Sequence, residues 1–185
     1  MSPGVAVPTT RPDRPGRDAF ADLARRHRIV PVWREVMADT LTPVSAFMLA
    51  VGEAPGFLLE SVEGGERWGR YSFVGRNPLA TIVGRGQVVS ADGPLELPAE
   101  VRARAAEGVL ATVDALLSAY RAPVFADLPP LHGGLVGYLG YDVVREVEHL
   151  PNEPPDDLGV PDAVLHVIGQ LCAFDHWRQR VVLVD

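Results

Sequence analysis

The sequence predicts an α+β protein, built mainly on antiparallel sheet with a few helices packed against it. Strand patterns come in runs, over residues 57–97 and 163–185, while the helical patterns lie apart from them. A chain that alternated helices with strands would instead favour a parallel sheet. No internal repeat is visible, and 185 residues suffice for one core that buries roughly 70% of the unfolded surface.

The first part of the chain predicts a disordered tail followed by a folded domain over residues 18–185. Residues 1–17 are rich in Pro, Arg and Gly and have no periodic apolar pattern, which is typical of a tail. A helix begins at Asp18, a suitable N-cap, and the strand expected at 29–36 contains Pro31, which favours a sheet edge. A second helix opens at the Thr42-Pro43 pair, with the threonine as its cap.

Strands dominate the middle of the chain. They are expected at residues 57–62, 70–75, 79–84 and 87–92, and Arg85-Gly86 predicts a tight hairpin between the last two. An apolar stripe then predicts a helix over residues 104–120. The remaining elements are a Gly-rich strand or turn at 133–142, a short helix at 141–147 and a surface loop at 151–162.

The closing segment, residues 163–185, predicts two long strands joined by a turn at 175–179. Its last five residues, VVLVD, continue the β pattern with no turn or polar tail behind them. An end strand of this kind leaves backbone groups unpaired and an apolar face open, and natural domains seldom stop there. We therefore expect the sequence to be a truncated part of a longer protein.

Composition excludes several classes of function. A net charge of −7 argues against nucleic acid as a partner, and no apolar run approaches the ~20 residues that span a bilayer. The single cysteine, Cys172, lies in an apolar stretch and is expected to be a buried structural thiol in a protein of the reducing cytoplasm. The five histidines lack the spacing of a metal site, so no metal ligands are expected in this chain.

One segment, FLLESVEGGERWGRYSFVG at residues 57–75, gathers groups that suit a free amino acid. Glu60 and the Ser61 hydroxyl can accept hydrogen bonds from an ammonium group, and the planar fork of Arg70 suits a carboxylate. The strands on either side of the acidic turn can pair, which would bring the three residues together. The alternative is a surface ion pair between Glu60 and Arg70, with Ser61 merely ending a strand.

A second motif, GGLVGYLGYD, superficially resembles a phosphate loop. It carries neither a GxxxxGK[ST] pattern nor a GxGxxG pattern behind a strand. Its glycines are better explained by close backbone packing or a bulge. These glycines are Gly133, Gly134, Gly137 and Gly140.

Two stretches, LLESVEGGERWGRYSFVG and GGLVGYLGYDVVREVEHLP, resemble in wording, order and spacing the N-terminal region of anthranilate synthase component I, the large subunit that converts chorismate. The loop at 154–162 and the closing strands resemble that family too, so the likeness covers about residues 30–185. The resemblance implies the N-terminal part of that fold, ending before the chorismate-binding region. It also implies that Glu60, Ser61 and Arg70 belong to the L-tryptophan feedback site of the first step in tryptophan biosynthesis.

The resemblance further implies that no catalytic residue lies in this chain. In that family the Mg²⁺ ligands and the acid–base groups belong to the C-terminal region, and ammonia comes from a glutamine amidotransferase subunit. The chain alone is therefore expected to be inactive as a lyase and to need no cofactor of its own. Two alternatives stay open: a stand-alone tryptophan-binding module, and the N-terminal part of aminodeoxychorismate synthase component I, although VEGGERWGRYSFVG favours the tryptophan branch.

Overall fold

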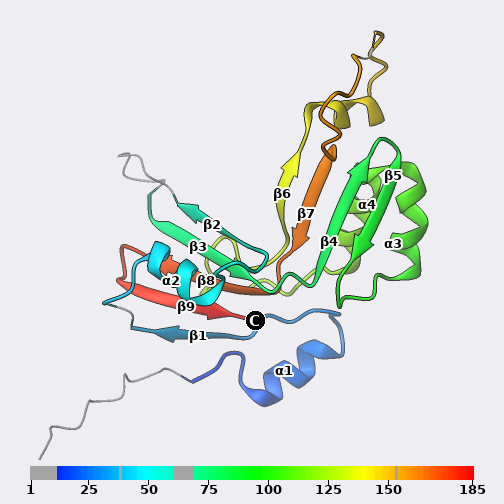
Figure 1. Cartoon of the computed structure of the whole chain (residues 1–185). Helices are drawn as coiled ribbons and strands as arrows, with labels where there is room; N and C mark the ends of the chain where they lie inside the picture. The colour runs from blue at the N-terminus through cyan, green and yellow to red at the C-terminus, as the bar shows by residue number, and fades with distance from the viewer. Residues whose placement is uncertain (1–11, 38, 61–68, 153) are drawn as a thin grey trace, which may run out of the picture.

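The protein is an α+β structure with two antiparallel sheets and a few helices, which confirms the predicted fold class. The computed structural model describes residues 12–37, 39–60, 69–152 and 154–185. In Figure 1 the two sheets stand at an angle to one another, with helix α2 against the first sheet and helices α3 and α4 against the second. Within the described residues, every helix is too short or too polar to cross a bilayer.

In the part of the chain that the structure describes, five strands form the first sheet, in the order β1-β9-β8-β3-β2. All four neighbouring pairs are antiparallel. The strands are β1 (Trp33–Val36), β2 (Gly56–Glu60), β3 (Tyr71–Arg76), β8 (Gln170–Asp175) and β9 (Arg180–Val184).

Four strands among the described residues form the second sheet, in the order β5-β4-β7-β6, again with antiparallel neighbours. The predicted hairpin at Arg85-Gly86 connects two of them and is confirmed. The strands are β4 (Ala80–Arg85), β5 (Val88–Asp92), β6 (Leu135–Leu139) and β7 (Ala163–Val167).

The prediction of two long strands over residues 163–185 is wrong, because the first of them is divided between the two sheets. β7 ends at Val167 and β8 begins at Gln170, and the chain passes from one sheet to the other through Ile168 and Gly169. The partner strands β3 and β4 change sheet at the same place, where Asn77 adopts a left-handed φ of 49°.

This corner requires a close approach of two backbones. A Cβ on Gly169 would lie 1.9 Å from the carbonyl oxygen of Asn77, so no side chain fits there. The Leu79 N–H donates to the Val167 carbonyl at 3.0 Å, and the side-chain amides of Asn77 and Gln170 lie 3.0 Å apart. An apolar β pattern continues through the corner, so periodicity alone could not reveal the division.

The expectation of an unpaired closing strand is also wrong. β9 lies inside the first sheet and pairs with β1 on one side and β8 on the other. Beyond the strand, the Val32 N–H donates to the Asp185 carbonyl at 2.8 Å, and the Asp185 N–H donates to the Val32 carbonyl at 2.9 Å. The partner strand β1 lies about 150 positions earlier in the sequence, beyond the reach of a local pattern. β1 itself lies at the edge of the sheet and begins two residues after Pro31, and its edge position is as predicted.

The first two helices lie where the sequence predicts them, but the N-cap of the first differs from the prediction. Helix α1 (Arg17–Ala24) follows Gly16 as its N-cap, so Asp18 lies in the first turn and does not cap it. Helix α2 (Pro43–Ala50) has the predicted Thr42 cap, completed by Ser45 in a reciprocal capping box.

The helix expected at 104–120 is confirmed from Val109 onward, as α4 (Val109–Ala119). Its expected first turn is instead the 3₁₀ helix η1 (Ala105–Glu107), which follows a separate helix, α3 (Ala99–Arg104). The division falls at Gly108, whose φ of 109° is open to glycine but strained for other residues. The short helix near residue 141 is a 3₁₀ helix, η2 (Tyr141–Glu146).

Residues at the start of the chain contact the first sheet. Arg14 forms an isolated antiparallel bridge with Trp33, and Asp13 pairs with Arg34 through two hydrogen bonds of 2.7 and 2.9 Å. The first eleven residues of the predicted tail lie outside the described residues, so there the tail stays a prediction.

The apolar side chains of the described residues pack in three clusters, two on the faces of the first sheet and one against the second. On one face of the first sheet, α2 contributes Ala46 and adjoins Val51, and these pack on Val74, Phe174 and Val181. The opposite face is covered by the segment that contains Phe125 and Leu128. The second sheet packs against α3, α4 and η2.

Two glycines of the Gly-rich motif serve close packing, as the spacing suggested, whereas a Cβ on Gly133 or Gly134 would meet nothing within 4 Å. A Cβ on Gly137 in β6 would lie 1.9 Å from the Val164 carbonyl of β7, and one on Gly140 would lie 3.0 Å from the Asp162 carbonyl. The segment thereby brings η2 to the start of α4, where the Glu146 carboxylate accepts bonds from the Val109 and Leu110 N–H groups at 2.7 and 2.8 Å.

We expect Glu146→Gln to lower the free energy of unfolding by about 1–2 kcal/mol, as loss of a helix cap does. The carboxylate satisfies two N–H groups at the positive end of α4, whereas a glutamine has one acceptor oxygen and no charge. Urea unfolding followed by circular dichroism measures the change. Glu148→Gln, at an exposed position two residues further on, is the control. Equal effects of the two variants would show that Glu146 is not a cap.

Candidate functional site

The predicted site residues lie at the adjacent ends of two paired strands. Glu60 is the exposed last residue of β2, in register with Ser72 of β3, and Arg70 directly precedes β3. The pairing of the two segments, which the sequence suggested, is confirmed. Ser61 lies outside the described residues, so its place in the site stays a prediction.

Arg70 has a carboxylate partner that the sequence did not suggest. Its Nε and Nη2 atoms donate to the two oxygens of Asp175 at 2.9 and 2.6 Å. The guanidinium also lies over the rings of Tyr71 and Trp177, 4.7 and 5.1 Å from their centroids. The Asp175 side chain is 1% exposed and that of Arg70 25%, so this is a largely buried ion pair. The alternative pairing of Arg70 with Glu60 is not the arrangement seen.

Asp175 stays ionised although it is buried. Burial raises its pKa, but the hydrogen bonds from Arg70 and the Arg178 N–H, with the charges of Arg70 and Arg180, outweigh that effect and hold the pKa below its ordinary value. The hydrogen bond to Asp175 in turn raises the pKa of the Arg70 guanidinium. Arg180 extends the chain of charges, since it lies 4.0 Å from Asp175 and pairs with Glu35.

Two aromatic rings stand at the end of β8. The Ser72 hydroxyl and Nε2 of His176 are 2.8 Å apart, which fixes the imidazole against β3. The rings of Phe174 and His176 lie nearly parallel, at an interplanar angle of 19° and a centroid distance of 6.5 Å. Ser72 is itself buried, so its hydroxyl acts as a support for His176 and is not open to a substrate.

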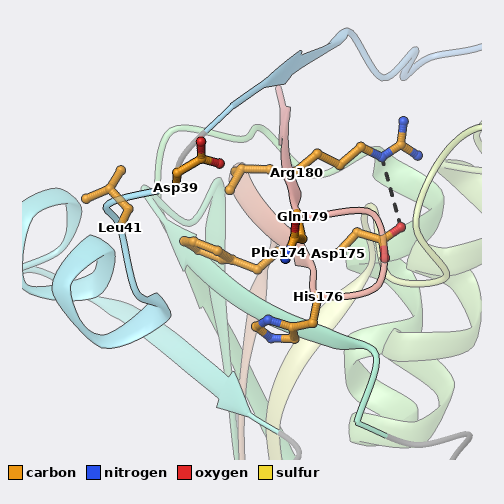
Figure 2. A pocket seen from close by; sticks show the side chains of 8 residues that line it. Asp39, Leu41, Phe174, Asp175, His176, Gln179 and Arg180 are labelled. Carbon is orange, nitrogen blue, oxygen red and sulfur yellow. Dashed lines mark ion pairs between the residues drawn. The ribbon is translucent and has the colours of Figure 1, made fainter.

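A cavity of about 380 Å³ opens beside the turn between β8 and β9, and we name it the hairpin hollow. In Figure 2, Asp39 and Leu41 stand on one side of it, Phe174 and His176 close another, and the guanidinium of Arg180 points toward Asp175, away from Asp39. Gln179 lies in the turn with a left-handed φ of 48°. The residues that line the hollow are Asp39, Leu41, Phe174, Asp175, His176, Gln179, Arg180 and Val181.

Register places Glu60 on the same face of the sheet as this hollow. Glu60 pairs with Ser72, and Ser72 pairs on its other side with Phe174. Phe174 then pairs with Val181, and Val181 with Val36. Residues that pair directly across antiparallel strands project from the same face, so the five form one row across the sheet. This is the face that α2 partly covers.

A second, more apolar cavity of about 600 Å³ lies on that face, between α2 and the ends of β3, β8 and β9. Cys172 lines it, and burial raises the pKa of the thiol to about 11, so the sulfur is protonated at neutral pH and is no nucleophile. The expectation of a structural thiol agrees with this setting, although the side chain is only half-buried.

These groups can bind a ligand, but the described residues offer little for bond-breaking chemistry. In the part of the chain that the structure describes, no three His, Cys, Asp or Glu side chains are grouped as a metal site. The Glu60 carboxylate is exposed, and its register places it on the face that carries Phe174. Asp175 pairs with Tyr71 and so projects from the opposite face, where the Arg70 guanidinium binds it and lies over the Tyr71 ring. Sequence reasoning missed Asp175 and His176, which lie more than a hundred positions after Arg70.

Three relatives of the chain carry the same name. The chain is 38% identical over 169 residues to anthranilate synthase component 1 of Mycolicibacterium smegmatis, and this match covers 91% of the chain and 32% of the relative. The component 1 of Mycobacterium tuberculosis is 39% identical over 186 residues, a match that covers 100% of the chain and 34% of the relative. That of Acetivibrio thermocellus is 34% identical over 170 residues, which covers 92% of the chain and 34% of the relative. No protein-family model matches the chain.

A crystal structure of anthranilate synthase component I from Streptococcus pneumoniae is also similar to the chain, with 23% sequence identity and a TM-score of 0.47. The match covers 80% of this chain and 30% of the Streptococcus pneumoniae chain. The sequence matches are the stronger finding. They show that the chain is homologous along its whole length to proteins named anthranilate synthase component 1. The likeness is to the N-terminal region of those proteins, and the chain spans about a third of the length of the curated relatives it matches.

Proposed function

We propose that the chain is the N-terminal regulatory and structural portion of an anthranilate synthase component I. The complete cytoplasmic enzyme would convert chorismate and glutamine-derived ammonia to anthranilate and pyruvate, the first step of tryptophan biosynthesis. The observation that carries the proposal is the match of the entire chain, at 39% identity, to about a third of that protein. A chorismate-binding region with its Mg²⁺ and a glutamine amidotransferase subunit would supply what the described residues do not offer.

The regulatory part of the proposal is an L-tryptophan feedback site that includes Glu60, Ser61 and Arg70. Glu60 is exposed at the end of β2, free to accept the ligand ammonium. Asp175 occupies two N–H groups of Arg70, and a guanidinium has five. Three N–H groups therefore stay available to the ligand carboxylate, and the side chain is one quarter exposed. Because Asp175 holds Arg70 on the side of the sheet opposite Glu60, one ligand would reach both groups only around the adjacent ends of β2 and β3.

A chimera tests this function. Residues 30–185 replace the matching region of the Mycolicibacterium smegmatis component 1, and anthranilate formation from chorismate and ammonia is followed by fluorescence. We expect an active enzyme that L-tryptophan inhibits. Ser61→Ala should raise the concentration for half inhibition about tenfold to a hundredfold, the range for one hydrogen bond to a charged group, without changing the uninhibited rate.

Ser90→Ala, in β5 of the other sheet, is the matched control and should leave inhibition unchanged. An active chimera that ignores L-tryptophan would refute the regulatory role. An inactive chimera that is nevertheless folded by circular dichroism would refute the structural one.

A further inference from the structure

We propose that the outer side of helix α2, together with the apolar cavity of about 600 Å³ beside it, is the surface on which the chorismate-binding region packs. The proposed function places that region after residue 185, so the inference rests on that function. It adds to the function an interface, which we name the α2 face and define by Val44, Met48, Leu49 and Leu183.

Helix α2 is apolar on all sides, and its sequence, PVSAFMLA, has no charged residue. Ala46 and Phe47 pack on the first sheet. The other side carries Val44, Met48 and Leu49, which are 48%, 71% and 79% exposed. A helix on a protein surface normally turns charged and polar residues outward, and a helix that is apolar all round is buried. The outer side of α2 is therefore expected to be covered in the complete protein.

The first sheet beside α2 is open in the same place. One row across four strands lies on the face that α2 partly covers, and the cavity is lined by all four of its members, Arg34, Leu183, Cys172 and Val74. Val74 is buried against α2, whereas Leu183, two strands away on β9, is 42% exposed. Apolar side chains inside a sheet are ordinarily covered by a second layer. Among the described residues, the layer over Leu183 is incomplete.

Charged residues line the same cavity. Asp13 and Arg34 are joined by two hydrogen bonds, and Arg76 and Asp185 are exposed. An exposed apolar patch with polar groups around it is typical of a surface that contacts another protein or domain. A mainly apolar contact is also more typical of a permanent interface than of a transient one.

The position of Asp185 points to the occupant. Asp185 lines the cavity and is joined to Val32 by two backbone hydrogen bonds, so a continuation of the chain would leave the first sheet at this cavity. Figure 1 marks the C-terminus at the end of β9. The chain matches only 32–34% of the length of its curated relatives, which leaves most of such a protein to cover a helix of eight residues. A second copy of the chain or an amidotransferase subunit has no such connection to the cavity.

Cysteine labelling tests the α2 face. Met48→Cys and Val88→Cys place a thiol at two positions of equal exposure, 71%, the first on α2 and the second on β5 of the other sheet. Both variants are made in this chain and in the chimera with the Mycolicibacterium smegmatis component 1. Reaction with iodoacetamide at neutral pH is followed by mass spectrometry of the separate peptides. Cys172, whose pKa is raised to about 11, is the slow internal reference.

We expect the two introduced thiols to react at similar rates in the chain alone. In the chimera, Met48→Cys should react about tenfold more slowly, because the interface would bury the thiol and keep it protonated. Val88→Cys should react at the same rate in both proteins. Circular dichroism checks that every variant is folded.

Leu49→Glu provides a second, independent measurement. Leu49 is 79% exposed, so we expect the urea midpoint of the chain alone to stay unchanged. In the chimera the glutamate would lie in an apolar contact, and the temperature of half inactivation should fall by several degrees. Val88→Glu is the matched control and should leave both quantities unchanged.

The outcomes distinguish this interface from the function on which it rests. An active chimera in which Met48→Cys reacts as fast as in the chain overturns the interface and leaves the proposed function standing. Protection that grows with the concentration of the chain alone, or that appears only when the amidotransferase subunit is added, assigns the α2 face to another occupant and also overturns it. A folded chimera that forms no anthranilate overturns the proposed function, while slow labelling of Met48→Cys in it would still support the interface.

Discussion

Asp175→Asn lowers the free energy of unfolding by about 3 kcal/mol, near the lower end of the range for breaking a buried ion pair from one side. The carboxylate is 1% exposed and accepts two hydrogen bonds from Arg70. An asparagine keeps the shape but loses the charge, and it leaves two cations without their common partner. The cost stays moderate because Arg70 reaches solvent and Arg180 retains Glu35. Urea unfolding measures it.

Asp13→Asn is the matched control. Asp13 pairs with Arg34 in the same two-bond geometry, at 2.7 and 2.9 Å, but both side chains are well exposed. Exposed pairs contribute little to stability, so the unfolding midpoint should barely move. Equal losses in the two variants would show that burial is not what makes the Arg70 pair matter.

The Arg70–Asp175 pair determines in which direction the free energy of unfolding changes with pH. The folded-state pKa of Asp175 lies below its ordinary value of 3.8, so the unfolded chain binds the proton more readily. The contribution of Asp175 is therefore complete above about pH 3.8 and is lost as the pH falls through the lower folded-state pKa. Unfolding measured between neutral and acid pH should show a smaller acid loss in Asp175→Asn than in the wild type.

Gly169→Ala should cost about 3 kcal/mol or more, at or above the usual range for overpacking. The added Cβ would meet the Asn77 carbonyl oxygen at 1.9 Å, and both groups are backbone, so neither can rotate away. The corner at which both pairs of strands change sheet would have to open. Thermal and urea unfolding measure the loss, and hydrogen exchange of Leu79, which bonds across the corner, should accelerate.

Gly84→Ala is the control for a glycine inside a strand. Its Cβ would meet Val109 at 3.4 Å and Ala163 at 3.5 Å, which is ordinary contact. We expect Gly84→Ala to raise or lower the free energy of unfolding only slightly. If Gly169→Ala were equally mild, the two backbones at the corner would not need to approach as closely as the structure shows.

Local signals account for the elements that were predicted correctly. The Thr42-Pro43 start of α2, the Arg85-Gly86 hairpin and the edge position of β1 each depend on residues next to one another in the chain. The errors share a different cause. The division of the strand at Gly169 and of the helix at Gly108 depends on what lies opposite those residues, namely the Asn77 carbonyl and the Glu146 carboxylate.

The candidate site divides in the same way. Glu60 and Arg70 were predicted from a single segment, and the resemblance gave them a role that stays proposed. Asp175 and His176 could not be connected to that segment, because the only signal was an Asp-His pair after an apolar strand. The register between β3 and β8 is what brings them beside Arg70 and Ser72.

The sequence by itself determined the fold class, most of the elements and the family resemblance, because these follow from local periodicity, turn chemistry and motif wording. Only the tertiary structure decided which strand pairs with which, that the closing strand lies between two others in its sheet, and that Arg70 is held by Asp175. Those facts depend on contacts between residues about a hundred positions apart. They are set by burial and charge pairing in the folded chain, and no pattern of neighbouring residues encodes them.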